Sequence, residues 1–249
     1  MKLLNGKVAS EHILRQLKQE IQDKKLHPYL VVIQVGNDPA SSVYVKNKQK
    51  TAEKIGIQSE TVHIDESITQ EKLIQFIYKC NDNPRINGIL VQLPLPKHID
   101  ERKVLDAICI TKDVDGFNPL NVGRLDIGQP RMIPSTPAGI MELLKFYNIS
   151  VKGKHVVIVG RSNIVGKPLA HLLLNEDATV TIAHSQTEDL KLLTKMADIL
   201  IVAIGQAEMI TANYVKDNAV VIDVGINRTE KGLKGDVNFN DVKSKVAWI

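Results

Sequence analysis

Apolar and polar positions follow two different periods along the chain. Apolar residues recur every three or four positions over residues 6–25, which predicts a helix. The run YLVVIQVG at 29–36 is almost continuously apolar and β-branched, which is typical of a buried parallel strand. Residues 39–55 are expected to form the next helix, because Pro39 suits its first turn and Gly56 suits its C-terminal cap. Strands and helices in alternation predict an α/β fold with parallel strands.

The alternation continues to the end of the chain. Further strands are expected at 61–64, 89–93, 155–160, 179–183, 198–204 and 219–224. Further helices are expected at 69–80, 138–147 and 166–175. Residues 112–137 are rich in Gly, Pro, Asn and Asp, which predicts a long functional loop or an inter-domain connection. The last residues, KVAWI at 245–249, have the pattern of a strand.

Composition excludes several classes of protein. A chain of 249 residues forms one large domain or two modest ones, and folds without disulfides or a structural metal. The net charge of +4 is spread along the chain, which disfavours nucleic-acid binding, and no apolar run is long enough to span a membrane. Cys80 and Cys109 form no C-x-x-C pair, which fits a reducing cytoplasm. The seven histidines lack ligand spacing, so no protein-bound metal is expected.

A nucleotide site is predicted in the segment HVVIVGRSNIVGKPLAHLLL. A strand leads into Gly160, a tight turn follows, and Gly166 opens a helix. Glycines let a pyrophosphate approach the backbone, and the helix N-terminus offers free N–H groups. The motif departs from G-x-G-x-x-G, because Ser162 stands at the middle glycine and one extra residue precedes Gly166. A purely structural glycine turn is the alternative.

Two features favour NADP over NAD. The strand at 179–183 ends in His-Ser-Gln, without the acidic residue that usually binds the ribose 2′-hydroxyl of NAD. Arg161 lies in the glycine loop, where a guanidinium is able to contact a 2′-phosphate. A solvated loop charge is the alternative role of Arg161.

A second group of polar residues lies in the first half of the chain. Tyr44 and Lys48 are four apart on the predicted helix and therefore share one face, as ordinary surface pairs also do. Short-chain dehydrogenases use Y-x-x-x-K downstream of their glycine loop, whereas this pair precedes the loop. Gln92 ends the strand in GILVQLPLP, and Asp113 and Asp115 follow in KDVDGFNP. Strand-end amides and loop carboxylates suit a polar heterocycle, although each is also common in turns and caps.

Six blocks of sequence, in order, carry a resemblance to a known family. They are VGNDPASSVYVKNKQKTAEKIGI, NGILVQLPLP, KDVDGFNPLNVGRL, STPAGIMELL, VVIVGRSNIVGKP and VVIDVGIN. The chain thereby resembles the bifunctional methylenetetrahydrofolate dehydrogenase/methenyltetrahydrofolate cyclohydrolase family nearly end to end. The resemblance implies two α/β domains with a cleft between them. Residues 1–118 would bind folate, and residues 119–249 would form a Rossmann-like NADP-binding domain with a mainly parallel sheet.

The resemblance also implies roles for the polar residues of the first half. Tyr44 would stack on the folate ring system, Lys48 would be catalytic, Gln92 would hold and tune Lys48, and Asp115 would anchor the pterin. Both Gln92 and Asp115 therefore count among the catalytic residues. A lysine held away from water is able to exchange protons near neutral pH, which suits general acid/base work in hydrolysis.

The cofactor implied by the resemblance is NADP, bound by the second domain. Gly160, Arg161 and Ser162 match the loop that contacts the nucleotide. Ser185 would lie near the 2′-phosphate and Ile226 near the nicotinamide. The expected partners are a small-molecule folate and a second copy of the chain, joined through the second domain, with neither nucleic acid nor membrane.

Two alternatives remain open at this point. The first is a monofunctional dehydrogenase of the same family. The presence of all four folate-side residues argues against it. The second is a non-catalytic nucleotide-binding module. Members of the family continue with a Pro- and Gly-rich segment resembling TPVPGGVGPMT, so KVAWI is expected to be a strand cut short, with a short edge strand as the alternative.

Overall fold

Contacts between residues divide the chain into two units. The computed structural model describes residues 1–230 and 232–249, and for residues 39–41 and 43 it describes the backbone alone. The N-terminal unit comprises residues 10–133, and the C-terminal unit comprises residues 134–249 together with residues 1–9. The first residues join the C-terminal unit because Asn5 N donates to the Tyr147 hydroxyl at 2.9 Å. The expected boundary at 118 therefore falls inside the N-terminal unit.

The N-terminal unit is built on a three-stranded parallel sheet in the order β2-β1-β3. Its strands are β1 (Tyr29–Val35), β2 (Gln58–Ile64) and β3 (Gly88–Val91). Its helices are α2 (Pro39–Ile55), α3 (Gln70–Asp82), α4 (Glu101–Asp106) and α5 (Pro119–Asp126), and α1 (Gly6–Asp23) leads into it.

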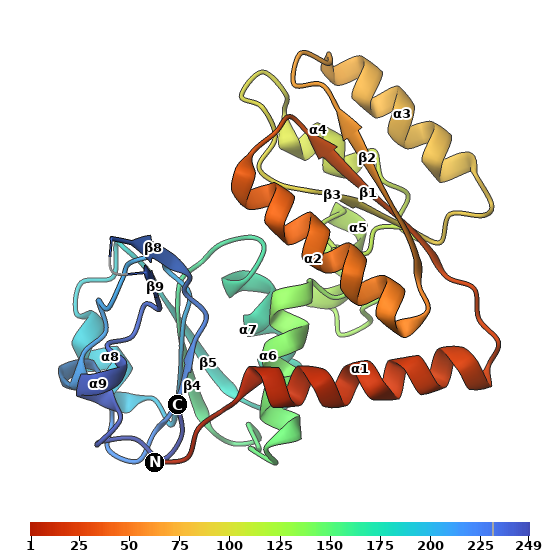
Figure 1. Ribbon diagram of the computed structural model, residues 1–249. Helices are drawn as coiled ribbons and strands as arrows, with labels where there is room; N and C mark the ends of the chain where they lie inside the picture. The colour runs from red at the N-terminus through yellow and green to blue at the C-terminus, as the bar shows by residue number, and fades with distance from the viewer. Residues whose placement is uncertain (231) are drawn as a thin grey trace. The chain divides into compact units, whose positions relative to one another are not determined.

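Strand β1 is apolar at successive positions because helices cover both faces of its sheet. Ile33 packs in one cluster with Leu73 of α3, whereas Val32 packs with Val45 of α2. Figure 1 shows α2 and α3 on opposite sides of this sheet. A parallel strand buried on both faces loses the polar alternation of a half-exposed strand. The continuous apolar run at 29–36 is explained by this packing.

The C-terminal unit holds a four-stranded parallel sheet in the order β5-β4-β6-β7 and a separate hairpin of β8 and β9 (Figure 1). The strands are β4 (His155–Val159), β5 (Thr179–Ala183), β6 (Ile199–Val202), β7 (Val220–Asp223), β8 (Asn227–Thr229) and β9 (Gly232–Lys234). The helices are α6 (Ser135–Phe146), α7 (Gly166–Asn175), α8 (Leu190–Met196) and α9 (Phe239–Val242), with a 3₁₀ turn at Ala212–Tyr214. One core cluster packs Ile158 and Ile201 against Leu144 and Leu169.

The predicted class is confirmed, and the main difference lies in the region 112–137. Of the two alternatives for this region, the long loop is wrong, because the region contains α5 and the start of α6, whereas the boundary between the two units does lie within it, after residue 133. The Asn118 side chain accepts from Leu120 N at the start of α5, and Pro119 occupies its first turn. Leu125, 1% exposed, anchors the helix in the core. Asn-Pro is thus a helix start here and not a loop signal.

The final residues form isolated β-bridges and do not form a strand of several residues. Trp248 makes parallel bridges with Val220 and with Lys2. The Tyr147 and Trp248 rings lie 5.4 Å apart between centroids, which packs this segment onto the end of α6. Among the described residues, no helix has the length and apolar character needed to cross a membrane.

Candidate active site

Both parallel sheets reverse their strand order at one point. In the N-terminal unit the chain runs from β1 to β2 on one side and then to β3 on the other. In the C-terminal unit β5 and β6 flank β4 in the same way. Open parallel sheets bind ligands beyond the carboxyl ends of the strands at such points. Each unit therefore has one place where a ligand site is expected.

At the carboxyl end of β3, Gln92 meets Lys48 of α2. Lys48 Nζ donates to Gln92 Oε1 at 3.3 Å. Gln92 Nε2 donates to the Leu93 carbonyl at 2.8 Å, and its backbone N donates to the Ile33 carbonyl at 2.9 Å. These bonds leave the amide oxygen facing the lysine. Lys48 is exposed, and so is Tyr44 at 46%, so both are accessible to a ligand.

Asp115 belongs to the same site and has an unusual environment. Partial removal from water raises the pKa of the Asp115 carboxyl, the ammonium of Lys48 lowers it, and the nearby Asp113 carboxylate raises it. The net shift is upward. Lys48, Gln92 and Asp115 thus form one group of interacting side chains.

Asp113, also singled out in the sequence, has a structural role. It is 1% exposed, and its Oδ2 accepts hydrogen bonds from Asn118 N and Asn121 Nδ2, both at 2.8 Å. Its segment pairs with β3, since Ile89 bridges Asp113 and Ile89 N donates to the Lys112 carbonyl at 2.7 Å. Asp113 therefore fixes the loop that carries the neighbouring site carboxylate.

Gln34 is a further polar residue of this region, and it lies outside the motifs that predict the site. It lies near the end of β1, is 2% exposed, and donates from Nε2 to Ser42 Oγ at 2.8 Å. The bond ties the strand to the first turns of α2, the helix that carries Lys48. A single amide within the apolar run YLVVIQV is the signal that would have found it.

In the C-terminal unit, the glycine loop packs as tightly as its sequence suggests. Gly160 has φ +129°, and a Cβ there would lie 2.3 Å from the Ala203 carbonyl oxygen. A Cβ on Gly166 would lie 2.1 Å from the Gly160 oxygen. The Ser162 hydroxyl accepts from Val165 N at 3.1 Å and from Gly166 N at 3.4 Å. Serine at the middle position thus binds two backbone N–H groups at the start of α7, whose N-cap residue is Val165.

The other predicted cofactor residues lie at the same edge of the sheet. Arg161 is exposed directly after β4, and Ser185 is exposed in the turn after β5. That turn is held by His184 N, which donates to Thr187 Oγ1 at 2.9 Å. Ile226 follows β7 and is 63% exposed. Three loops at one carboxyl edge therefore present the predicted residues to solvent.

Comparisons with known proteins agree with this geometry. Residues 4–115 match the tetrahydrofolate dehydrogenase/cyclohydrolase catalytic domain, and residues 134–249 match the NAD(P)-binding domain of the same family. The chain belongs to the tetrahydrofolate dehydrogenase/cyclohydrolase family. It is 54% identical to the bifunctional protein FolD of Streptococcus thermophilus over 252 residues, covering 99% of this chain and 89% of that protein.

Solved structures of the family have the same fold. A crystal structure of the bifunctional enzyme FolD from Campylobacter jejuni is 47% identical, has a TM-score of 0.97, and is matched over 100% of this chain and 90% of that one. A Trypanosoma brucei methylenetetrahydrofolate dehydrogenase-cyclohydrolase, complexed with NADP cofactor and inhibitor, is 35% identical with a TM-score of 0.88 over 98% and 86% of the two chains. The family resemblance, the enzyme class and the NADP cofactor predicted from the sequence are confirmed.

Proposed function

We propose that the chain oxidises 5,10-methylenetetrahydrofolate with NADP⁺ and hydrolyses the methenyl product to 10-formyltetrahydrofolate, as a step of one-carbon metabolism. The observation that carries this proposal is the contact of 3.3 Å between Lys48 Nζ and Gln92 Oε1 beside the carboxyl of Asp115. The amine of Lys48 is able to carry a proton during hydrolysis. The neutral amide of Gln92 and the carboxyl of Asp115 are able to form hydrogen bonds with folate and with the amine.

Each folate-side residue has a role that its chemistry supports. The exposed Tyr44 ring offers a flat face on which the folate ring system stacks. The Asp115 carboxylate accepts hydrogen bonds from the N–H groups of the pterin. Gln92 orients the amine of Lys48 without adding charge, since its own amide nitrogen is held by the Leu93 carbonyl.

Hydrolysis requires proton movement, which Lys48 performs. Water adds to the methenyl carbon, a C–O bond forms, and the added water loses a proton. The ring C–N bond then breaks as the remaining O–H becomes the formyl C=O, and the proton from that hydroxyl is delivered to the departing nitrogen, so that each hydrolysis releases one proton in all. Lys48 accepts and returns these protons as a general acid/base or relay. The bound folate covers the exposed amine, so that proton transfer takes place away from bulk water.

The residues of the C-terminal unit fit NADP. A Cβ at Gly160 would fill the space beside the Ala203 carbonyl, so only glycine leaves room for a close backbone approach at this loop. When bound, NADP⁺ accepts the hydride of the folate methylene bridge. Gly160 and Ser162 would hold the phosphates, Arg161 and Ser185 would lie near the 2′-phosphate, and Ile226 would border the nicotinamide.

The quaternary state and location are further parts of the proposal. We place a homodimer interface on the C-terminal unit, where β5 is an edge strand and Leu174 and Ile182 are exposed at 61% and 36%. Exposed apolar side chains along an open edge favour pairing.

The free thiols of Cys80 and Cys109 support a cytoplasmic location.

Ligand-dependent thermal stabilisation tests the proposal against a module that binds only nucleotide. Tetrahydrofolate and NADP⁺, added separately at saturating concentration, are each expected to raise Tm, because each binds the folded state. A Tm that responds to NADP⁺ but not to folate would favour the non-catalytic module. A monofunctional dehydrogenase would respond to both ligands but would not accelerate methenyl hydrolysis.

Arg161→Ala tests the cofactor preference. We expect it to weaken NADP⁺ binding by about tenfold or more and NAD⁺ binding much less, because a charge-assisted contact to a 2′-phosphate exists only with NADP⁺. Dissociation constants for both nucleotides, measured by titration calorimetry, give the comparison. Equal weakening of both would contradict the role of Arg161.

The shifted carboxyl predicts a pH dependence of folate binding. The raised pKa of Asp115 means that it becomes protonated at a higher pH than an ordinary aspartate. Folate affinity should therefore fall as the pH drops through this raised pKa, because a protonated carboxyl accepts fewer hydrogen bonds. Titrations at several pH values check this. Asp115→Asn should bind weakly without this pH dependence, and a retained dependence in that variant would assign it to another group.

A further inference from the structure

We propose that Asp236 is a positioning residue for hydride transfer, which fixes the loops after β6 and β7 at the nicotinamide end of the cofactor site. The inference rests on the proposed function, in which Ile226 borders the nicotinamide. Asp236 follows β9, is 0% exposed, and has no role in the mechanism described above.

The Asp236 carboxylate fills a ring of backbone N–H groups after β6. Its Oδ2 accepts from Ile204 N at 2.7 Å and from Gly205 N at 3.1 Å, and its Oδ1 accepts from Gln206 N at 2.8 Å. Gly205 has φ +66°, the left-handed conformation that turns successive N–H groups toward one point. Such concave sets of N–H groups bind anions. Here the protein's own carboxylate occupies the site and fixes the shape of the loop.

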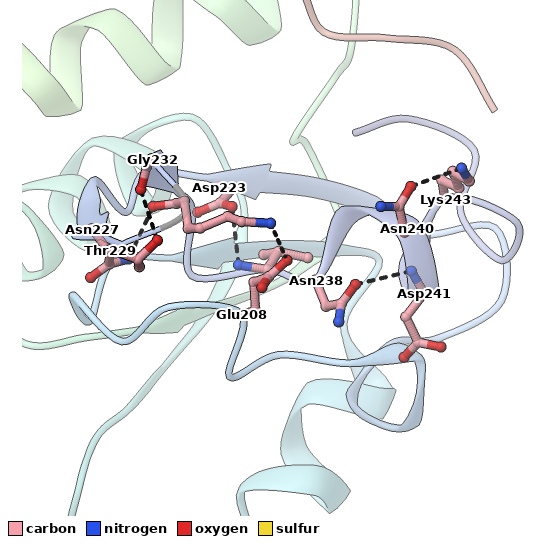
Figure 2. A network of polar contacts seen from close by, with 11 residues as sticks. Glu208, Asp223, Asn227, Thr229, Gly232, Asn238, Asn240, Asp241 and Lys243 are labelled. Atoms are coloured by element: carbon pink, nitrogen blue, oxygen red, sulfur yellow. Dashed lines mark hydrogen bonds and ion pairs between the residues drawn. The ribbon is translucent and has the colours of Figure 1, made fainter.

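The same carboxylate bonds the loop after β7 on one side of Ile226 and packs closely against it on the other. Asn227 Nδ2 donates to Asp236 Oδ1 at 2.9 Å, and a Cβ on Gly225 would lie 2.2 Å from the Asp236 side chain. Asp223 completes the arrangement by accepting from Asp236 N at 2.9 Å. Figure 2 includes Asp223, at the end of β7, and Asn227, at the start of β8, among the residues of a polar network in this region.

Ile226 is exposed, whereas these contacts fix the residues on either side of it. A large aliphatic side chain that is 63% exposed between two anchored residues is presented to a ligand by a rigid backbone. The loop after β6 also reaches the glycine loop, because the Ala203 oxygen occupies the space beside Gly160. One buried carboxylate therefore connects the loops that follow β4, β6 and β7 and that border the proposed cofactor site.

Full hydrogen bonding accounts for the burial of a charge at this position. A buried carboxylate is costly unless donors satisfy it, and Asp236 has three backbone N–H groups and one side-chain amide. Asparagine at the same position would place an NH₂ group against these donors. The loops would then relax, and the nicotinamide would no longer be held in one position.

The test is Asp236→Asn in the full chain, with the two activities measured separately. We expect the dehydrogenase kcat to fall about 10- to 100-fold, with KM for NADP⁺ changed by less than about threefold, because misplacement affects the reacting end more than the bound phosphates. The deuterium isotope effect for methylene-labelled substrate should increase. Hydrolysis of 5,10-methenyltetrahydrofolate supplied without NADP⁺ should stay within about twofold of its original rate.

Asp198→Asn is the matched control. Asp198 precedes β6 at the opposite end of the strand, where its carboxylate accepts from His155 N at 3.0 Å and from Lys216 Nζ at 2.7 Å. This variant should lower the stability of the same unit and leave the isotope effect unchanged. If Asp236→Asn does not fold, Asn227→Ala removes one donor to Asp236 and should give the same kinetic signature in smaller degree.

The outcomes separate this inference from the proposed function. Unchanged kcat and isotope effect in a folded Asp236→Asn or Asn227→Ala variant would overturn the role of Asp236 alone. An equal change in kcat and isotope effect in Asp198→Asn would also overturn the role of Asp236, because the effect would then come from general destabilisation of the unit. Absence of NADPH formation by the unaltered chain would overturn the proposed function, and this inference with it.

Discussion

Replacing Lys48 with glutamine is expected to reduce methenyl hydrolysis by about 10²- to 10⁴-fold, the usual contribution of a positioned proton-transfer group. The glutamine side chain keeps some hydrogen-bonding capacity toward Gln92 but is unable to carry a proton. NADP⁺ binding should change little, because the nucleotide loop belongs to the other unit. The loss of methenyl absorbance measures hydrolysis, and thermal stabilisation by NADP⁺ measures cofactor binding.

Lys50→Gln is the matched control for this substitution. Lys50 is another exposed lysine of α2, but a spacing of two residues places it on a different face from Lys48. It should retain nearly full hydrolytic activity. Equal losses in the two variants, or an equal loss of hydrolysis and NADP⁺ binding in Lys48→Gln, would contradict the role of Lys48.

Gly160→Ala is expected to destabilise the C-terminal unit by about 2–5 kcal/mol and to abolish stabilisation by NADP⁺. Two effects combine, since φ of +129° strains any side-chain-bearing residue and the new Cβ would lie 2.3 Å from a backbone oxygen. Denaturant unfolding with and without NADP⁺ measures both consequences.

Gly153→Ala separates these two effects. Gly153 has φ +69° in the turn before β4, and no atom lies within 4 Å of the position its Cβ would take. Only backbone strain should act there, at a cost of about 1–2 kcal/mol, with NADP⁺ binding retained. If Gly160→Ala were no more destabilising than Gly153→Ala and still bound NADP⁺, the close packing of the nucleotide loop would not be required.

The local pattern of apolar and polar residues is sufficient to predict the strands and helices whose buried positions recur at regular intervals. Strand 179–183 and helix 166–175 were predicted with the bounds that the structure has, because a β-branched run and a glycine start are local signals. Strand β2 begins at Gln58, three residues earlier than predicted, because edge strands are partly exposed and mix polar with apolar residues. Helix α5 was missed because Asn118 and Pro119 serve equally as turn and helix-start residues.

The site was only partly accessible to sequence reasoning. Spacing placed Tyr44 and Lys48 on one helix face, but the contact of Lys48 with Gln92 joins residues 44 positions apart, and only the fold brings them together. Asp236 illustrates the limit, because its four donors come from loops about 10 and 30 residues upstream. In sequence, a lone aspartate after a glycine is indistinguishable from a turn residue.

The most direct test of the account is a two-wavelength time course with the chain, 5,10-methylenetetrahydrofolate and NADP⁺. One signal follows NADPH and the other follows the methenyl product. We expect that NADPH forms, that the methenyl signal decays faster than without enzyme, and that NAD⁺ is a poorer cofactor. NADPH formation with methenyl decay at the enzyme-free rate would contradict it, because Lys48, Gln92 and Asp115 would then support oxidation without hydrolysis.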